Sequence, residues 1–140
     1  MLNSIYNQTV TILNKLKRED SATGLDVWHK TVLHDAAWYT DSVMAASSNS
    51  AHINTVITVL LPFHDEYLPY LEWKQSGMQV GHFTMSNGDY IILGEIEEDF
   101  TASTIVKELQ KYGENVCTVK QNKLVHDRFN ASVQLRVQGV

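Results

Sequence analysis

The sequence contains a single cysteine and no long hydrophobic run. Cys117 alone cannot form an internal disulfide, and one cysteine fits a chain made in a reducing cytoplasm. The longest apolar run, residues 56–62, is interrupted by Thr58 and is far too short to span a bilayer. The N-terminal residues have neither the basic region nor the apolar core of a signal peptide. We therefore expect no membrane partner.

Residue patterns typical of catalytic and metal sites are also missing. The six histidines include no His-x-His pair and no helical His-x-x-x-His pair, so hydrogen-bonded or solvated histidines are expected. No nucleophile elbow surrounds a serine, and Gly77 and Gly81 lack the rest of a phosphate-binding loop. Cys117 lies between Val116 and Thr118 in a strand-like run, where a core residue is the simplest interpretation. We expect no catalytic residue, no metal and no cofactor.

Glu95, Glu97, Glu98 and Asp99 form a run of carboxylates. A glycosidase needs two carboxylates held apart across a cleft, and adjacency in the sequence does not provide that arrangement. A solvated face, or the flank of a helix N-terminus, is the better interpretation.

Basic residues are scarce in the middle of the chain. Residues 19–100 hold thirteen acids against two bases, whereas residues 1–18 and residues 101–140 each carry a net charge of +3. So acidic a middle argues against wrapping DNA, because Lys and Arg contacts to phosphates supply most of that affinity. If the basic ends meet in space, the domain has a basic side and an acidic side, which suits head-to-tail packing of identical subunits. The alternative is solvated charge scattered over a monomer.

The length of 140 residues suits one domain, and an apolar content of 44% is enough for a core. Alternation of apolar and polar residues predicts about seven short strands. Asn87-Gly88 predicts a tight hairpin turn between two of them. In the last strand, Leu135 and Val137 are expected to face the core and Arg136 the solvent. The predicted strands are residues 9–13, 26–32, 54–61, 80–85, 89–96, 116–120 and 132–138.

One α-helix is predicted late in the chain, at about residues 101–112. Thr101 can cap its first turn and Gly113 can end it. One face carries an apolar stripe of Ile105, Val106, Leu109 and Tyr112. The sequence as a whole predicts a single, mainly β domain over residues 1–140. We expect a small β-sandwich or partly open β-barrel of about seven strands, with this helix packed across it.

Two longer segments are candidate binding regions. Residues 40–54 are rich in Ala, Ser and Asn, which predicts a flexible loop or an extended arm. Residues 63–79 form an aromatic-rich loop whose aromatic residues are spaced so that a helical turn would align them. Such residues concentrate at binding hot spots, although a satellite cluster that seals the barrel is an alternative. The candidate partner-contact residues are Met44, Ser47, Asn49, Tyr67, Tyr70 and Trp73.

Four stretches of the sequence resemble small proteins of phage structural-gene clusters. The main likeness is in residues 81–96, GHFTMSNGDYIILGEI. Residues 9–11 (TVT), 70–73 (YLEW) and 135–140 (LRVQGV) resemble their opening strand, their aromatic segment and their last strand. The chain thus resembles the tailed-phage head-completion proteins of the head–tail connector, also called stopper, head-closure or minor capsid proteins. It departs from their pattern at Phe129-Asn130, where a His-Trp-like pair is expected.

The resemblance implies a β-barrel subunit of a ring beneath the portal, which closes the DNA-filled head and provides the tail docking surface. Its partners would be further copies of itself, a portal or adaptor protein on the head side, and a tail-terminator or tail protein on the other. DNA in the channel would lie near it without specific contact. The protein would be found in the neck of the virion, and in the host cytoplasm during assembly.

Two alternatives stay open. One is a tail or baseplate structural component, which would bind neighbouring subunits in the same way but at another position in the virion. The other is a small-ligand-binding β-barrel, with residues 67–73 as its lid.

Overall fold

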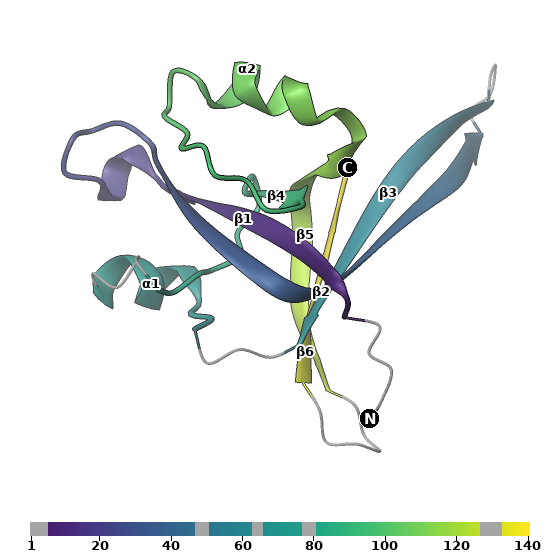
Figure 1. Cartoon of the computed structure of the whole chain (residues 1–140), viewed down its shortest axis with the longest axis horizontal. Coiled ribbons are helices and arrows are strands. Elements are labelled where there is room, and N and C mark those ends of the chain that lie inside the picture. The colour runs from purple at the N-terminus through teal and green to yellow at the C-terminus, as the bar shows by residue number, and fades with distance from the viewer. Residues whose placement is uncertain (1–5, 47–50, 63–65, 77–80, 127–132) are drawn as a thin grey trace.

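The computed structural model describes residues 6–46, 51–62, 66–76, 81–126 and 133–140 (Figure 1). Six antiparallel strands close into a barrel in the order β1-β2-β3-β6-β5-β4. These strands are β1 (Gln8–Leu16), β2 (Val27–Ala46), β3 (Ala51–Pro62), β4 (Tyr90–Leu93), β5 (Val116–His126) and β6 (Val133–Gly139). The mainly β fold with a small barrel is confirmed. The described strands number six, and their barrel is closed rather than partly open.

Two pairings between strands that are distant in the sequence close the barrel. At one seam β4 pairs with β1, with Val10 opposite Leu93. At the other β6 lies between β3 and β5, with Ile57 opposite Gly139. Gly139 passes so close to β5 that an added Cβ would lie 1.9 Å from the carbonyl oxygen of Thr118. This close approach requires glycine.

One face of the barrel wall points inward and fills the interior. Leu135 and Val137 are buried on this side while Arg136 between them is exposed, which confirms the predicted sides of the last strand. Each large aliphatic residue buried in this way stabilises the fold by about 1.5–3 kcal/mol. The inner core consists of Val10, Ile12, Ala36, Ile57, Val59, Leu61, Phe83, Met85, Ile91, Cys117, Val119, Leu135 and Val137.

A second, smaller core lies on the outer face of β1 and β4. Helix α2 (Ile105–Leu109) and the 3-10 helix η2 (Gln110–Asn115) cover this face (Figure 1). The buried members of this core are Leu13, Ile92, Phe100, Ile105 and Leu109. The helix predicted at 101–112 is therefore present and packs on the barrel wall. Residues 101–104 form a turn before it. Of the predicted apolar stripe, Ile105 and Leu109 are buried, whereas Val106 is 66% exposed and does not face this core.

The aromatic-rich segment contains a second helix, α1 (Tyr70–Ser76). The loop predicted over residues 63–79 is wrong for these seven residues. A helix this short is marginal in isolation, so tertiary contacts must hold it. Residues 63–65 and 77–80 lie outside the described residues.

Residues 40–46 and 51–54, expected within a flexible loop, belong to β2 and β3. The two strands pair continuously from Ala37 opposite Leu60 to Ala46 opposite Ala51. The loop prediction is wrong for these residues, and the alternative of an extended arm agrees with the pairing. Strand propensity depends strongly on context, so a run of small residues can still form a paired strand.

The Asn87-Gly88 turn is present, but the hairpin predicted around it is not. The Asp89 N–H donates to the carbonyl of Ser86 at 3.0 Å, and Gly88 has a φ of 94°. The segment before the turn does not pair with β4. Phe83 in that segment forms a bridge with Tyr67 instead.

A buried polar network explains why this segment leaves the sheet. The Asn14 side chain donates to the carbonyl of Thr84 (2.6 Å) and accepts from its N–H (3.1 Å), so the backbone of Thr84 needs no strand partner. The Asp89 carboxylate accepts hydrogen bonds from Asn14 Nδ2 (2.9 Å), Ser86 N–H (3.0 Å) and Lys15 N–H (3.1 Å). Burial raises the pKa of Asp89 to about 6, against the lowering effect of these three donors.

Candidate interaction surfaces

The structure brings three of the six candidate contact residues together around α1. The ring centroids of Tyr67 and Phe83 are 5.7 Å apart, and those of Tyr70 and Trp73 are 5.8 Å apart. Trp73 is 0% exposed, and its ring meets that of His29 edge-on at 5.4 Å. Direct contact of Trp73 with a partner does not fit this burial, whereas the satellite-cluster alternative does. Tyr67 and Tyr70 are half-buried.

Tyr70 fastens α1 to the 3-10 turn η1 (Arg18–Asp20) that follows β1. Its hydroxyl donates to Asp20 Oδ2 at 2.8 Å and accepts from the Lys17 N–H at 3.1 Å. Lys74 Nζ lies 3.1 Å from Asp20 Oδ1. Burial and the hydrogen bond to Asp20 raise the pKa of Tyr70 to about 12, and hydrogen bonds from Tyr70 and Lys74 lower the pKa of Asp20. These polar groups are thus already engaged within the chain.

Beyond the barrel, β2 and β3 continue as a two-stranded ribbon, here called the arm (residues 40–46 and 51–56). Figure 1 shows it projecting away from the other strands. β1 pairs with β2 only as far as Ala36, and β6 pairs with β3 only from Ile57. Within the described residues, neither outer edge of the arm has a strand partner. Open edges of this kind are templates for pairing with another chain.

Of the remaining candidate contact residues, Met44 lies in the arm, opposite Ile53. Ser47 and Asn49 lie outside the described residues. At about 3.4 Å per residue, one strand of the arm reaches about 20 Å. The arm can therefore contact a neighbour well away from the barrel that carries it.

A groove of about 630 Å³ lies where the arm leaves the barrel. On one side are residues at the root of the arm, and on the other are the end of η2, the start of β5 and the last residue. A segment that entered this groove would contact the arm and η2 together. The lining residues are Trp38, Thr40, Thr55, Ile57, Gly113, Glu114, Asn115, Val116, Thr118 and Val140.

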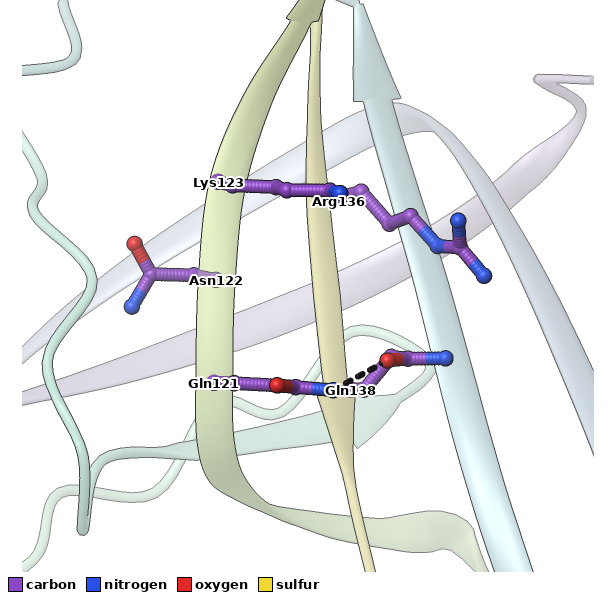
Figure 2. Close-up of a pocket in the computed structure, with 5 residues that line it drawn as sticks. All are labelled: Gln121, Asn122, Lys123, Arg136 and Gln138. Atoms are coloured by element: carbon purple, nitrogen blue, oxygen red, sulfur yellow. Dashed lines mark hydrogen bonds between the residues drawn. The ribbon is translucent and has the colours of Figure 1, made fainter.

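Two cations face each other on the outside of β5 and β6. Lys123 is opposite Arg136 in the register, and both are exposed. Beside them Gln121 is opposite Gln138, and their amides are hydrogen-bonded. Figure 2 shows these four side chains on one side of the two strands and Asn122 on the other. We call Gln121, Lys123, Arg136 and Gln138 the cationic strip.

A β-bulge at Lys120 produces this strip. The register skips Lys120 between buried Val119 and exposed Gln121. Side chains alternate along a strand, so without the extra residue Gln121 and Lys123 would follow Val119 into the barrel. With the bulge, Asn122 turns inward and the two longer polar side chains face outward.

The segment between β4 and α2 holds the run of four carboxylates, and two of them are engaged within the chain. Asp99 lies 3.4 Å from Lys30 Nζ. Glu98 accepts hydrogen bonds from the Tyr112 hydroxyl and from Lys111 Nζ (3.2 Å), and these lower its pKa. The Lys30 ammonium also donates to two backbone carbonyls of the segment, at 2.7 and 3.2 Å. The segment is therefore held in a defined position.

The other two carboxylates, Glu95 and Glu97, are exposed. They flank Ile96, which packs against the smaller core. In the part of the chain that the structure describes, neither has an ion-pair partner. We call Glu95 and Glu97 the acidic pair.

The single cysteine of the chain, Cys117, is buried in the inner core and does not reach these surfaces. Burial raises the pKa of the Cys117 thiol to about 12, so it is protonated at neutral pH. Among the described residues no group of three His, Cys, Asp or Glu side chains could hold a metal ion. None of the described helices is long and apolar enough to cross a membrane.

Sequence reasoning identified the arm and the aromatic segment as regions, but it missed the cationic strip. The alternation in residues 132–138 correctly placed Arg136 outside. Its neighbour Lys123 lies past the end of the strand predicted at 116–120. The bulge at Lys120 interrupts the alternation there, so the second half of β5 could be found only by allowing a shift of one residue.

Comparison with known protein families identifies a match over nearly the whole chain. A family model described as "Family of unknown function (DUF6751)" matches residues 5–140, which include every described strand. No curated protein and no solved structure matches the chain.

Proposed function

The chain belongs to the DUF6751 family of unknown function, and from its own sequence and structure we propose that it is a structural virion protein. In this proposal it is a subunit of a ring in a phage head–tail connector. The ring closes the DNA-filled head and offers the tail its docking surface. Further copies of the chain are its first partners, and a portal or adaptor protein and a tail protein bind the two faces of the ring.

The observation that carries the proposal is the arm on a closed barrel. A closed barrel leaves no open strand edge in its wall, so the wall itself offers no template for pairing with another chain. The arm adds two open edges and reaches about 20 Å outward. A two-stranded ribbon is marginal by itself in water, and packing against another protein stabilises it. The arm therefore suits contact with a neighbouring subunit.

Two further features support a ring. Residues 81–96 and the ends of the chain resemble the head-completion proteins. A ring repeats one heterologous contact around an axis, and this needs two different surfaces on each subunit. One such surface is the arm with the groove at its root. The barrel wall on the side of the molecule away from the arm is the second, different surface.

The small-ligand alternative receives less support from the structure. A small-ligand barrel needs space inside its wall, but here thirteen buried residues form one core cluster in the interior. A tail or baseplate component would also use the arm, and it differs only in its position in the virion.

The test is electron microscopy of negatively stained protein, alone and mixed with capsids that carry the portal. We expect rings in solution or at the portal vertex. In a shortened variant, Asn-Gly replaces residues 43–54, so that Ser42 and Thr55 close a two-residue hairpin. It should keep the barrel, judged by circular dichroism and thermal unfolding, and lose the rings.

The matched control is Val106→Ala. Val106 is 66% exposed on α2, which covers the smaller core and belongs neither to the arm nor to the groove at its root. This variant should assemble like the wild type. A wild-type protein that stays monomeric in both settings contradicts the proposal, as does a shortened variant that assembles normally.

A further inference from the structure

Among the residues that the structure describes, no counter-charge accompanies the cationic strip. Lys123 and Arg136 lie directly opposite each other on adjacent strands, and like charges in this position destabilise a sheet. Within the described ranges no carboxylate pairs with either cation. The strip bounds a shallow hollow of about 130 Å³, lined by Gln121, Asn122, Lys123, Arg136 and Gln138 (Figure 2). A hollow of this size has room for several water molecules, and hence for a carboxylate head group.

The chemistry of the strip suits a pair of carboxylates. An Arg guanidinium binds a carboxylate through two parallel hydrogen bonds, and a Lys ammonium adds a second charge. The amides of Gln121 and Gln138 lie next to these cations and can bond to the same ligand.

The same chain carries a matching ligand in the acidic pair. Glu95 and Glu97 are exposed, two residues apart, and held in place by Ile96 between them. The acidic pair follows β4 beyond the Ile92–Val116 pair, whereas Lys123 lies seven residues further along β5 in the opposite direction, opposite Arg136. The strip and the acidic pair of one molecule therefore face different neighbours, and a head-to-tail contact between copies can join them.

DNA is a weaker candidate for the same strip. Proteins that bind the duplex through its phosphates typically make about 6–10 such contacts. Here two cations stand opposite each other on a chain whose net charge is −5. Two cations are enough to bind a pair of carboxylates on a second copy of the chain.

We infer that the cationic strip of one subunit binds the acidic pair, Glu95 and Glu97, of the next copy of this chain. The inference rests on the proposed ring and names one of its contacts. The contact is electrostatic and exposed to solvent, so it weakens as salt is added.

Charge exchange tests this contact. The strip variant carries Lys123→Glu and Arg136→Glu, and the pair variant carries Glu95→Lys and Glu97→Lys. Each alone places like charges in contact, and we expect assembly to weaken at least tenfold, measured by sedimentation velocity and by ring counts on portal-bearing capsids. The variant with all four changes, and an equimolar mixture of the strip and pair variants, should both recover rings. Lys107→Glu, an exposed change on α2, is the control and should assemble normally.

The outcomes separate the contact from the ring. Strip and pair variants that form rings like the wild type overturn the contact and leave the proposed function standing. Losses that neither the four-change variant nor the mixture restores also overturn it. A wild-type protein that forms no ring in either setting overturns both. A strip variant that still forms rings but loses retardation of duplex DNA in a gel assigns the strip to phosphate.

Discussion

Leu135 and Arg136 are neighbours in β6, but they face opposite sides of the barrel wall. Leu135 is buried in the inner core and Arg136 is exposed. Leu135→Ala leaves a cavity and should lower the free energy of unfolding by about 2–5 kcal/mol. Arg136→Ala should change it by less than about 1 kcal/mol. Urea denaturation of the two variants checks this. Equal shifts of the midpoint would mean that the side-chain directions in β6 are wrong.

Asp89 gives the fold a dependence on pH. Burial raises its pKa to about 6 from an ordinary value of 3.8, so the folded protein holds this proton more tightly than the unfolded chain. The stabilisation is therefore complete below about pH 4 and is lost as the pH rises through about 6. This rise of the pKa of Asp89 from 3.8 to about 6 corresponds to about 3 kcal/mol of stability.

Asp89→Asn removes this titration and leaves the rest of the chain unchanged. The free energy of unfolding of the wild type minus that of Asp89→Asn should fall by about 3 kcal/mol between pH 3 and pH 7. Urea titrations at several pH values measure the difference. Asp20→Asn is the control and should give the opposite slope, because the pKa of Asp20 is lowered in the fold. A flat Asp89 difference would mean that its three donors cancel the effect of burial on its pKa.

At the scale of elements, α1 shows what tertiary contacts add to a short segment. Trp73 is fully buried on this helix, and Leu71, two residues before it, is 61% exposed. Trp73→Ala should cost about 3–5 kcal/mol because it empties a large buried volume. Leu71→Ala should cost less than about 1 kcal/mol. Thermal and urea unfolding compare them, and similar losses would contradict the described orientation of α1.

The sequence shows α1 and the arm as regions of interest but does not reveal their structure. The spacing of Tyr70 and Trp73 suits a helix, yet seven residues are too few to be stable without the contact to Asp20 and the core. Most of residues 40–46 are small side chains with low strand propensity, so these residues form a strand because they pair with β3. In both cases the deciding interactions join segments distant in the sequence.

At the scale of the whole molecule, alternation predicts the fold class but not the order of the strands. Apolar residues recur at every second position in β1 (Val10 and Ile12) and in β6, where Leu135 is one of them. All three of these residues are buried. The placement of residues 82–86 outside the sheet depends on Asn14, about 70 residues earlier, whose side chain binds Thr84. The cationic strip depends on one inserted residue in β5. Local patterns do not contain such long-range information.

The strand order also decides when the chain can finish folding. β1, β2 and β3 pair in sequence order, so this part can form as soon as it leaves the ribosome. β6 fits between β3 and β5, and until residues 133–139 have been synthesised both strands keep an open edge. Pairings over about 80 residues are slow, with folding times on the order of milliseconds to seconds. During synthesis, β3 therefore exposes both its unpaired edge and its apolar side chains. This is the surface that a chaperone would need to cover.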